Sequence, residues 1–413
     1  MRALRASALL FGALVAPRTA LATPAELVGT GPRSTALAGA GTSLALGAES
    51  ALMNPAKLAP AAKELSFGLR ASRFVLELEQ GGTAEPFSAE SSKGFFLGAT
   101  TPLSDGRIQS AFGLFAASPP DFIVRADLPF AEEPDFPLLV RRSNAFDFAA
   151  GLGFHIDGLS FGVGLRVLAA LSGTVGVKQQ DGVPTQVVDN ELVPAVAPVF
   201  GLGVEPGGDF SLGASLRTAL RADFDVTLAT SGLGGIPLPP MHIRGVAHYE
   251  PLRVDTEVSR RFERTTVLVA LAYERWSDYP GPLGSTLECP DDVPTCGTSA
   301  PPPPNASDVF VPRLAGSHEF SIARMSSVVR AGYAYVPAAL PEQRGAANAF
   351  DSARHGLSLG YSLGLPPGGV PLHLDAAFRI DLLVPRTHEK SDGAEIRTSG
   401  HIQTFVFGAR VDL

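Results

Sequence analysis

From about residue 62 to the C-terminus, apolar and polar positions alternate with a period of two. In the stretch NAFDFAAGLGFHID, residues 144–157, the even positions from 146 onward carry Phe, Ala, Leu and Ile. The odd positions from 147 onward carry Asp, Ala, Gly and His. Segments 372–384 and 404–413 repeat this pattern. Because successive side chains of a strand point to opposite faces, the pattern predicts strands with one apolar face and one polar or glycine-rich face.

The connectors between these predicted strands alternate between short and long. The short ones contain turn residues such as Asp-Gly and Pro-Gly-Gly, and the long ones are rich in Pro and acidic residues. Such alternation is typical of an outer-membrane barrel, with periplasmic turns at one end and extracellular loops at the other. The sequence therefore predicts an all-β fold, a transmembrane antiparallel β-barrel of about 14 strands. The short connectors lie at 104–106, 157–158, 206–209, 323–326 and 366–369, with a less defined one near 251–264, and the long ones lie at roughly 80–92, 119–141, 177–192, 226–240, 277–308, 338–353 and 385–400.

A soluble β-sandwich would alternate in the same way, so the N-terminus and the composition decide between the two folds. Residues 1–22 begin with Arg2 and Arg5, continue with the short apolar run SALLFGALVA and end in Ala-Leu-Ala. This order predicts a signal peptide and a mature chain that starts near Thr23. Charged residues make up only 18% of the chain, yet it contains no run of 18 apolar residues. Together these features favour a barrel in the outer membrane of a Gram-negative bacterium.

The charge balance limits the possible partners. Removal of the signal peptide, which has three Arg and no acidic residue, lowers the formal net charge from −8 to −11. Because the chain also lacks a basic block, nucleic acid is not expected as a partner.

The two cysteines, Cys289 and Cys296, stand in the segment ECPDDVPTCG within the longest Pro-rich connector. An exported chain permits a disulfide, and we predict one in an extracellular loop. Metal binding is the alternative, but two ligands without a nearby His do not make up a metal site.

The segment 23–61 does not alternate. It is too apolar for a tail and too short for a domain, so it predicts a plug, or hatch, folded into the lumen of the barrel. Near its end, Asn54 is suited to cap a short helix whose first residue is Pro55, because Pro lacks the N–H that would be unpaired there. The predicted organisation is a signal peptide at 1–22, a hatch at 23–61 and an outer-membrane barrel at 62–413.

Three segments carry a resemblance to a known family. The stretch GTGPRSTALAGAGTSLALGAESALMNPAKLA, residues 29–59, resembles the amino-terminal hatch of the FadL family of outer-membrane long-chain fatty-acid transporters. AYERWSDYP at 272–280 and the segment 330–361, with its Pro loop and Arg-His strand start, are also similar to that family. The resemblance implies that Asn54, Pro55 and Ala56 close the hatch and fix its exit into the first strand.

The resemblance also implies a function. A hydrophobic small molecule, a long-chain fatty acid or a related hydrocarbon, is expected to be captured among the extracellular loops and to pass to an interior pocket. It would then leave sideways through the wall near the third strand, here about residues 107–118, without energy input. The implied partners are this cargo and outer-membrane lipid, and the chain is expected to be a monomer. The alternative is a barrel that serves as a secretion or protein-interaction accessory.

Candidate substrate-binding residues follow from this interpretation. The connector 119–140 is unusually apolar for an extracellular loop, and Phe122, Ile123, Phe130 and Phe136 are candidates for a capture groove. The alternative is a loop that packs on itself or on lipid. A guanidinium binds a carboxylate in a bidentate manner, so Arg217 and Arg221 are candidates for binding a cargo carboxylate. Pairing with acidic side chains across strands is their alternative role.

The sequence contains no convincing enzymatic motif. The pattern G-x-S-x-G of a nucleophile elbow occurs at 158–162, 356–360 and 360–364, but each copy falls on a predicted strand and none opens a helix. Repetition of Gly and Ser at one parity is explained by a lumen face of small residues. The eight histidines show no metal-ligand spacing, and no phosphate-binding Gly loop is present. We therefore predict that the protein is not an enzyme and has no cofactor and no metal site.

Overall fold

The computed structural model describes residues 30–87, 89, 91–118, 134–139, 147–180, 183–207, 209–231, 241–281, 287–288, 304–345, 347–365, 371–390 and 393–413. The predicted signal peptide, the first residues of the predicted hatch and both cysteines lie outside these ranges.

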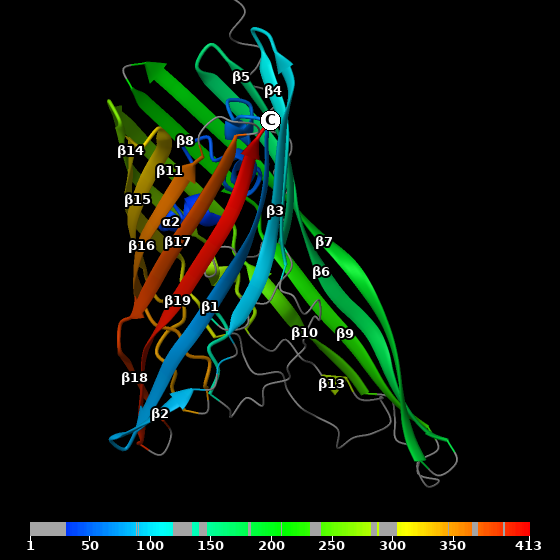
Figure 1. The fold of residues 1–413 in the computed structure, drawn as a ribbon. Coiled ribbons are helices and arrows are strands. Elements are labelled where there is room, and N and C mark those ends of the chain that lie inside the picture. The colour runs from blue at the N-terminus through cyan, green and yellow to red at the C-terminus, as the bar shows by residue number, and fades with distance from the viewer. Residues whose placement is uncertain are drawn as a thin grey trace, which may run out of the picture.

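Fourteen of the described strands form a closed antiparallel barrel, which confirms the predicted fold (Figure 1). Neighbouring strands pair in chain order, and the last strand returns to the first, with Leu65 opposite Val411. Where the ladder closes, no wall strand has a free edge, as a membrane-spanning sheet requires. The wall strands are β1 Glu64–Gln80, β3 Ser92–Asp105, β4 Gln109–Ser118, β5 Asp147–Ile156, β6 Leu159–Gln180, β7 Val183–Gly207, β8 Phe210–Arg217, β11 Arg253–Phe262, β12 Thr265–Glu274, β14 Val309–Ile322, β15 Met325–Val336, β16 Arg354–Gly364, β17 Leu372–Leu383 and β19 Glu395–Asp412.

The short turns gather at one end of the barrel, here called the turn end, and the long connectors at the other, the loop end. Asp157 and Gly158 both have positive φ, 47° and 81°, as a tight two-residue hairpin requires. The turn that the sequence left undefined is formed by Glu263, with φ 52°, and Arg264, between β11 and β12. The loop end also carries β2 Thr83–Phe87, β9 Leu220–Ser231, β10 Met241–Glu250, η4 Trp276–Asp278, β13 Leu287–Glu288 and β18 Arg386–Glu389.

Three predicted loops are wrong in their extent. We expected connectors at 177–192, 226–240 and 385–400, but β6 continues to Gln180, β7 begins at Val183, β9 continues to Ser231 and β19 begins at Glu395. The sequence on both sides of residues 181–182 is rich in Val and Thr, which favour extended structure, and those two residues are Asp-Gly. The wall therefore extends into a long hairpin where the acidic and Pro residues had indicated a loop.

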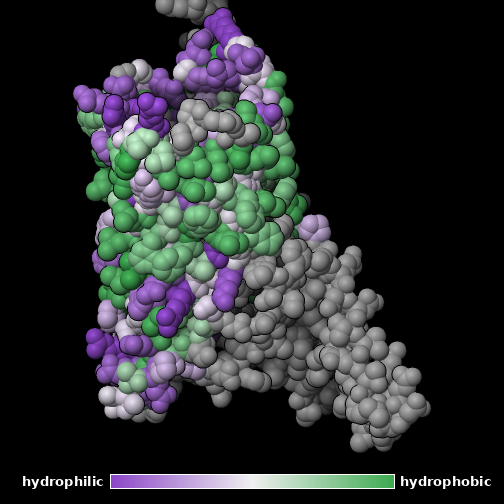
Figure 2. Space-filling view, viewed as in Figure 1, coloured by the Kyte–Doolittle hydropathy of each residue, from purple (hydrophilic) through white to green (hydrophobic). Residues whose placement is uncertain are grey.

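The outer face of the barrel is apolar at mid-height (Figure 2). Leu69 of β1, Val269 of β12 and Phe405 of β19 are each more than half exposed, although their residue types are usually buried. Figure 2 shows apolar residues as a band between two polar ends of the barrel. A band of this kind faces lipid, and the strands' alternate residues face the lumen. Among the described residues, no helix is long and apolar enough to cross a membrane.

The N-terminal segment lies inside the barrel (Figure 1). Nearly all of its described residues up to Leu58 are buried. Ala36, Leu52 and Leu58 pack with Phe96 and Phe115 of the wall. We refer to residues 30–61 as the hatch. Its short helices are α2 Pro32–Ala36, η1 Gly47–Glu49, α3 Ser50–Met53 and η2 Pro55–Leu58.

Glycines on the lumen face allow the hatch to approach the wall. A Cβ added at Gly162 of β6 would lie 2.1 Å from the backbone nitrogen of Ala56, and one at Gly201 of β7 would lie 2.1 Å from Oδ1 of Asn54. Both are closer than any side chain allows, so only Gly fits at these positions. Gly360 of β16 meets Ala36 in the same way. Gly162 and Gly360 belong to the G-x-S-x-G patterns, which therefore reflect hatch packing.

Candidate functional site

Asn54 anchors the end of the hatch to the wall. Its Oδ1 accepts a hydrogen bond from the backbone N–H of Ala56 (3.1 Å) and caps η2, whose first residue is Pro55. Its Nδ2 donates to the carbonyls of Thr42 (2.7 Å) in the hatch and Leu202 (3.1 Å) in β7. Asn54 is fully buried, so all these bonds form away from water. An amide suits this position because it supplies two donors and an acceptor on a short side chain.

Lys57 forms a second contact of η2 with the wall. Its Nζ lies 3.0 Å from Oε1 of Glu205 in β7 and 3.0 Å from Oγ of Ser211 in β8. The lysine side chain is almost fully buried, whereas that of Glu205 is 42% exposed. The long alkyl stem therefore passes between hatch and wall, and the charged end meets a carboxylate near the turn end.

Glu257 of β11 holds the loop in the middle of the hatch. Its carboxylate accepts hydrogen bonds from the backbone N–H groups of Gly41 (2.6 Å), Thr42 (3.1 Å) and Ser43 (3.0 Å). The hydroxyl of Ser43 donates a further bond (2.6 Å). Successive backbone N–H groups that converge in this way form an anion nest. Here a wall carboxylate occupies the nest, so the loop and β11 are fixed to each other.

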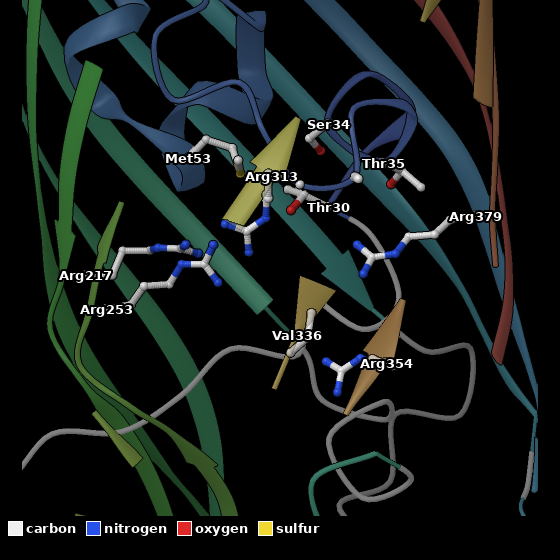
Figure 3. A pocket seen from close by; sticks show the side chains of 12 residues that line it. Thr30, Ser34, Thr35, Met53, Arg217, Arg253, Arg313, Val336, Arg354 and Arg379 are labelled. Carbon is white, nitrogen blue, oxygen red and sulfur yellow. The ribbon is translucent and has the colours of Figure 1, made fainter. Parts of the chain in front are cut away.

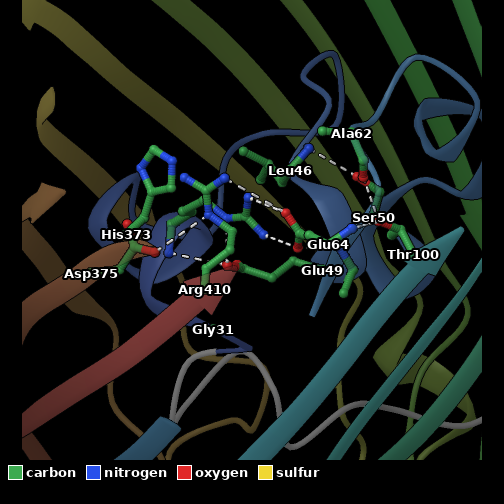
Figure 4. Close-up of polar contacts among 12 residues, drawn as sticks. Gly31, Leu46, Glu49, Ser50, Ala62, Glu64, Thr100, His373, Asp375 and Arg410 are labelled. Carbon is green, nitrogen blue, oxygen red and sulfur yellow. Dashed lines mark hydrogen bonds and ion pairs between the residues drawn. The ribbon is translucent and has the colours of Figure 1, made fainter. Parts of the chain in front are cut away.

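Arg33 ties the beginning of the hatch to the first strand (Figure 4). Its guanidinium lies 3.2 Å from Glu49 through Nε and 2.7 Å from Glu64 of β1 through Nη2. Glu49 also accepts the backbone N–H groups of Arg33 and Ser34. Figure 4 shows Arg410 of β19 beside this cluster. Arg33, Glu49 and Glu64 are all buried, so removal of the Arg33 guanidinium would leave two buried carboxylates with fewer partners.

A small cavity lies between residues of the hatch, including α2, and the wall (Figure 3). Five arginines line it, one each from β8, β11, β14, β16 and β17, and we call it the arginine cavity. Its volume is about 20 Å³, room for about one water molecule. It is too small for an alkyl chain. The lining residues are Thr30, Ser34, Thr35, Ala38, Gly39, Met53, Arg217, Arg253, Arg313, Val336, Arg354 and Arg379.

Carboxylates from the same strands hold the arginines in place. Asp255 accepts hydrogen bonds from Arg217 (2.6 Å) and from Arg253 (2.6 and 2.7 Å). Arg253 also donates to Glu274 (2.9 Å). Asp381 receives two bonds from Arg379 (2.6 and 2.9 Å). The pairs Arg217–Asp255 and Arg253–Glu274 join neighbouring strands, as expected for lumen charges, whereas Arg253–Asp255 and Arg379–Asp381 lie two residues apart on one strand.

An aromatic cluster adjoins the arginine cavity on its loop-end side. The rings of Tyr249, Trp276 and Tyr279 have centroids 4.9–6.0 Å apart. They pack in one apolar core with Val336, which also lines the arginine cavity. Nε1 of Trp276 donates to Oε2 of Glu274 (2.9 Å), the carboxylate whose other oxygen is bound by an arginine of the cavity. The AYERWSDYP segment therefore connects an apolar surface with the arginine cavity.

The wall strands around β4 and β5 part toward the loop end. Within the described residues, the pairing of β5 with β6 reaches Phe148 opposite Val167. Beyond it, Ser172–Lys178 of β6 pairs in parallel with Asp225–Ser231 of β9 instead. Figure 1 shows β6, β7, β9 and β10 leaning away from β1 and β3 in this half of the molecule. Within the described ranges, no strand ladder joins β3 to β6 there.

The residues predicted from sequence lie in different places. Phe136 is fully buried and packs on Phe87 of β2 (5.1 Å between centroids) and on Phe350 (5.8 Å), two residues outside its own connector. Arg217 lines the arginine cavity, whereas Arg221 lies on β9 and is half-buried. The other predicted residues, Phe122, Ile123, Phe130, Cys289 and Cys296, lie outside the described residues, and the disulfide stays a prediction.

Sequence reasoning did not find the arginine cavity as a group. Arg313 and Arg379 stand out because they share the lumen parity of their strands, but parity does not report the height of a residue in the barrel. Arg253 begins β11 and Arg354 begins β16, so both lie at strand ends where no alternation is visible. Their position directly before an alternating run was the only sequence feature that could have placed these two arginines on the lumen face.

A Ser-His contact does occur within one of the G-x-S-x-G patterns. Oγ of Ser160 lies 2.8 Å from Nδ1 of His155, across the first turn of the β5–β6 hairpin. Ser160 is fully buried, so its hydroxyl is not accessible to an acyl substrate. The pair is accounted for as a cross-strand hydrogen bond that fills the lumen face.

Comparison with known proteins supports the architecture. No family model matches the chain, and no curated protein matches it. Among solved structures, a FadL homologue of Pseudomonas aeruginosa matches 93% of this chain and 98% of its own, with a TM-score of 0.61 and 14% identity. The toluene transporter TodX of Pseudomonas putida matches 94% and 99% (TM-score 0.55, 15% identity), and the monoaromatic hydrocarbon channel CymD matches 94% and 98% (TM-score 0.53, 16% identity). The fold is that of the FadL-type outer-membrane channels, as the hatch sequence indicated.

Proposed function

We propose that the protein transports hydrophobic small molecules across the bacterial outer membrane by passive diffusion. The cargo is a long-chain fatty acid or a related hydrocarbon, which enters at the loop end and leaves sideways into the bilayer. The observation that carries this proposal is the parting of the wall beyond Val167, where β6 pairs with β9 rather than with the strands toward β3. Similarity in fold to structures described as toluene and monoaromatic hydrocarbon channels supports the same class of cargo.

The hatch supports transport by lateral release rather than through an open pore. It is held at Asn54, Glu257 and Arg33 by buried hydrogen bonds and ion pairs. A lumen closed in this way blocks hydrophilic solutes at the turn end. An apolar molecule has a lower free energy in the bilayer than in the periplasm, so an exit toward lipid requires no energy input.

The test is uptake by a Gram-negative host that lacks its own fatty-acid transporter. Cells that express the protein should take up radiolabelled oleate or toluene faster than cells with the empty vector, and a protonophore should not abolish the difference. Permeability to a small hydrophilic sugar should stay at the control level, because the hatch closes the lumen. Equal uptake of both hydrophobic compounds by the two strains would contradict the proposal.

The alternative, an accessory role in secretion or protein interaction, is favoured by one observation. The lumen at the hatch is densely filled, and the arginine cavity is far smaller than a drug-sized ligand site. If the protein acts as an accessory, it should co-purify with a defined partner after cross-linking in intact cells, and its deletion should impair export while leaving hydrocarbon uptake unchanged.

A further inference from the structure

We propose that Arg73 of β1 and Lys93 of β3 bind a phosphate group of lipopolysaccharide on the outer face of the barrel. Lipopolysaccharide is the anionic lipid of the extracellular leaflet of the outer membrane, and the long connectors of an outer-membrane barrel lie on that side. The site is independent of the proposed transport function, because both side chains lie on the lipid-facing surface and not in the lumen.

Both cations share the strand face that carries the apolar band. On β1, Phe67 and Leu69 are more than half exposed, and Arg73, which is also exposed, has the same parity and lies closer to the loop end. On β3, Lys93 is exposed and stands two positions before the exposed Phe95. Figure 2 shows hydrophilic residues over β1 and β3 on the loop-end side of the apolar band. The two charges therefore lie at the height of the lipid headgroups on that side.

Strand register brings the two cations together. Lys93 lies opposite Ala71 of β1, so Lys93 and Arg73 are diagonal neighbours on one face. Such neighbours lie about 7–8 Å apart, and two long side chains at this separation reach the oxygens of one phosphate. On the other side of β1, Gln403 of β19 lies directly opposite Arg73 and is half-buried. Three strands thus place two cations and an amide donor side by side.

The positive charge of this pair is not neutralised by the protein. Among the described residues, neither Arg73 nor Lys93 forms a hydrogen bond or an ion pair through its side chain. The two carboxylates farther along the same face of β1 are engaged elsewhere. Glu77 accepts a hydrogen bond from a hydroxyl of β19 (3.4 Å), and Glu79 pairs with an arginine of β19 (3.7 Å). Adjacent cations at a membrane surface attract anionic headgroups.

The surroundings favour a lipid over a free phosphate ion. Lipopolysaccharide carries its innermost phosphates on a sugar unit that also bears several acyl chains. A guanidinium and an ammonium group bind the phosphate, the guanidinium in a bidentate manner. Phe95, Leu69 and Phe405 are exposed on the same face toward the turn end and offer apolar surface to the acyl chains. A free phosphate ion would use only the cations.

Native mass spectrometry of the full protein in a non-ionic detergent measures this binding. The lipid anchor of lipopolysaccharide (lipid A), the same molecule without its phosphates, and phosphatidylglycerol are added as separate titrants. EDTA is present, because divalent cations would otherwise bridge phosphates to carboxylates of the protein. The measured quantity is the fraction of protein with one lipid bound at each lipid concentration.

Substitutions locate the site. Arg73→Gln and Lys93→Gln should each weaken lipid A binding about fivefold, and the double variant about thirtyfold. Both side chains are exposed, so folding should survive, which heat-modifiable migration on a gel checks. Lys63→Gln combined with Arg261→Gln is the matched control. It removes the same two residue types from exposed positions at the turn end and should leave lipid A binding unchanged.

Each outcome decides between the possible occupants. Saturable binding of one lipid A that requires its phosphates, and that the double variant of Arg73 and Lys93 weakens, supports the site. Equal binding of lipid A with and without phosphates overturns it, as does equal binding of lipid A by the double variant and the native protein. Phosphatidylglycerol binding as tight as that of lipid A, and weakened equally in the double variant, overturns the assignment to lipopolysaccharide. None of these results bears on transport.

Discussion

At the scale of single residues, the hatch depends on buried polar side chains that each make several hydrogen bonds. Asn54 makes three hydrogen bonds from a position with no access to water, and Glu257 accepts four. Side chains of this kind stabilise one position of the hatch, since any displacement leaves several buried donors unpaired.

Substitution of Asn54 by Ala should loosen the hatch without unfolding the barrel. The variant loses the cap of η2 and two bonds to carbonyls, a cost of about 1–3 kcal/mol. In a planar bilayer, the variant should show brief conductance openings that the native protein lacks, with an unchanged melting temperature of the barrel. Asn54→Asp should behave similarly, because it retains the acceptor but loses both donors. A closed channel in both variants would show that other contacts suffice to hold the hatch.

His388 should make the loop end sensitive to acid. It lies on β18, beyond the wall strands, where Nδ1 accepts the backbone N–H of Gln343 (3.0 Å). Burial lowers the pKa of His388 to about 4, below its ordinary value of 6.5. Because the folded-state pKa is depressed, the neutral form stabilises this contact above pH 6.5, and the stabilisation is lost as the pH falls toward 4.

The check is amide hydrogen exchange of residues 337–345, corrected for the intrinsic effect of pH. Protection should decrease between pH 6.5 and 4 in the native protein. In His388→Asn, whose side chain does not titrate, the same segment should show no such decrease. Equal pH dependence in the two proteins would rule out His388 as the titrating group.

At the scale of elements, the sequence predicted the features that depend on local periodicity. It missed those that depend on how high each residue lies in the barrel. The strands and the cap at Asn54 followed from alternation and from the preference of Asn and Pro for helix starts. The extension of β6 and β7 was missed because the acidic and Pro residues near 183–192 resemble a loop. The arginine cavity was missed because five strands bring its residues to one height, and no single strand contains that information.

The glycine face of β6 should be essential for hatch docking and dispensable for the barrel. Gly162→Leu would place a side chain where the backbone of Ala56 lies. The barrel should still assemble, seen as heat-modifiable migration on a gel, but its ion conductance should rise. Gly316→Ala is the control, because the nearest neighbour of its Cβ is a wall carbonyl at 3.1 Å rather than the hatch. A closed Gly162→Leu channel would contradict this account of the glycines.

At the scale of the whole molecule, barrel and hatch contribute separately. The wall strands pair with one another in a ladder that does not involve the hatch, and the hatch fills part of the lumen. The predicted boundary at residue 61 lies three residues before β1 begins at Glu64. The wall residues Glu257 and Glu64 belong to strands that pair independently of the hatch.

Deletion of residues 25–53 should therefore leave a barrel that assembles and conducts. Loss of the hatch exposes the lumen to water, so conductance in a planar bilayer should rise severalfold. Uptake of hydrophobic cargo should fall, because the interior apolar surface would flood. Failure of the deleted protein to fold would show that the hatch belongs to the structural core. Folding with unchanged conductance would show that the wall side chains close the lumen by themselves.

The parallel pairing of β9 with β6 has a consequence for the kinetics of release. The edge of β6 at Ser172–Lys178 is already paired with β9. Another wall strand could pair with this edge only after the seven-residue ladder between β6 and β9 had broken. An exit at this place would be a permanent aperture and not a gate. The last step of transport would then obey the partition coefficient of the cargo between protein and bilayer, and net flux would reverse direction whenever the concentration gradient does.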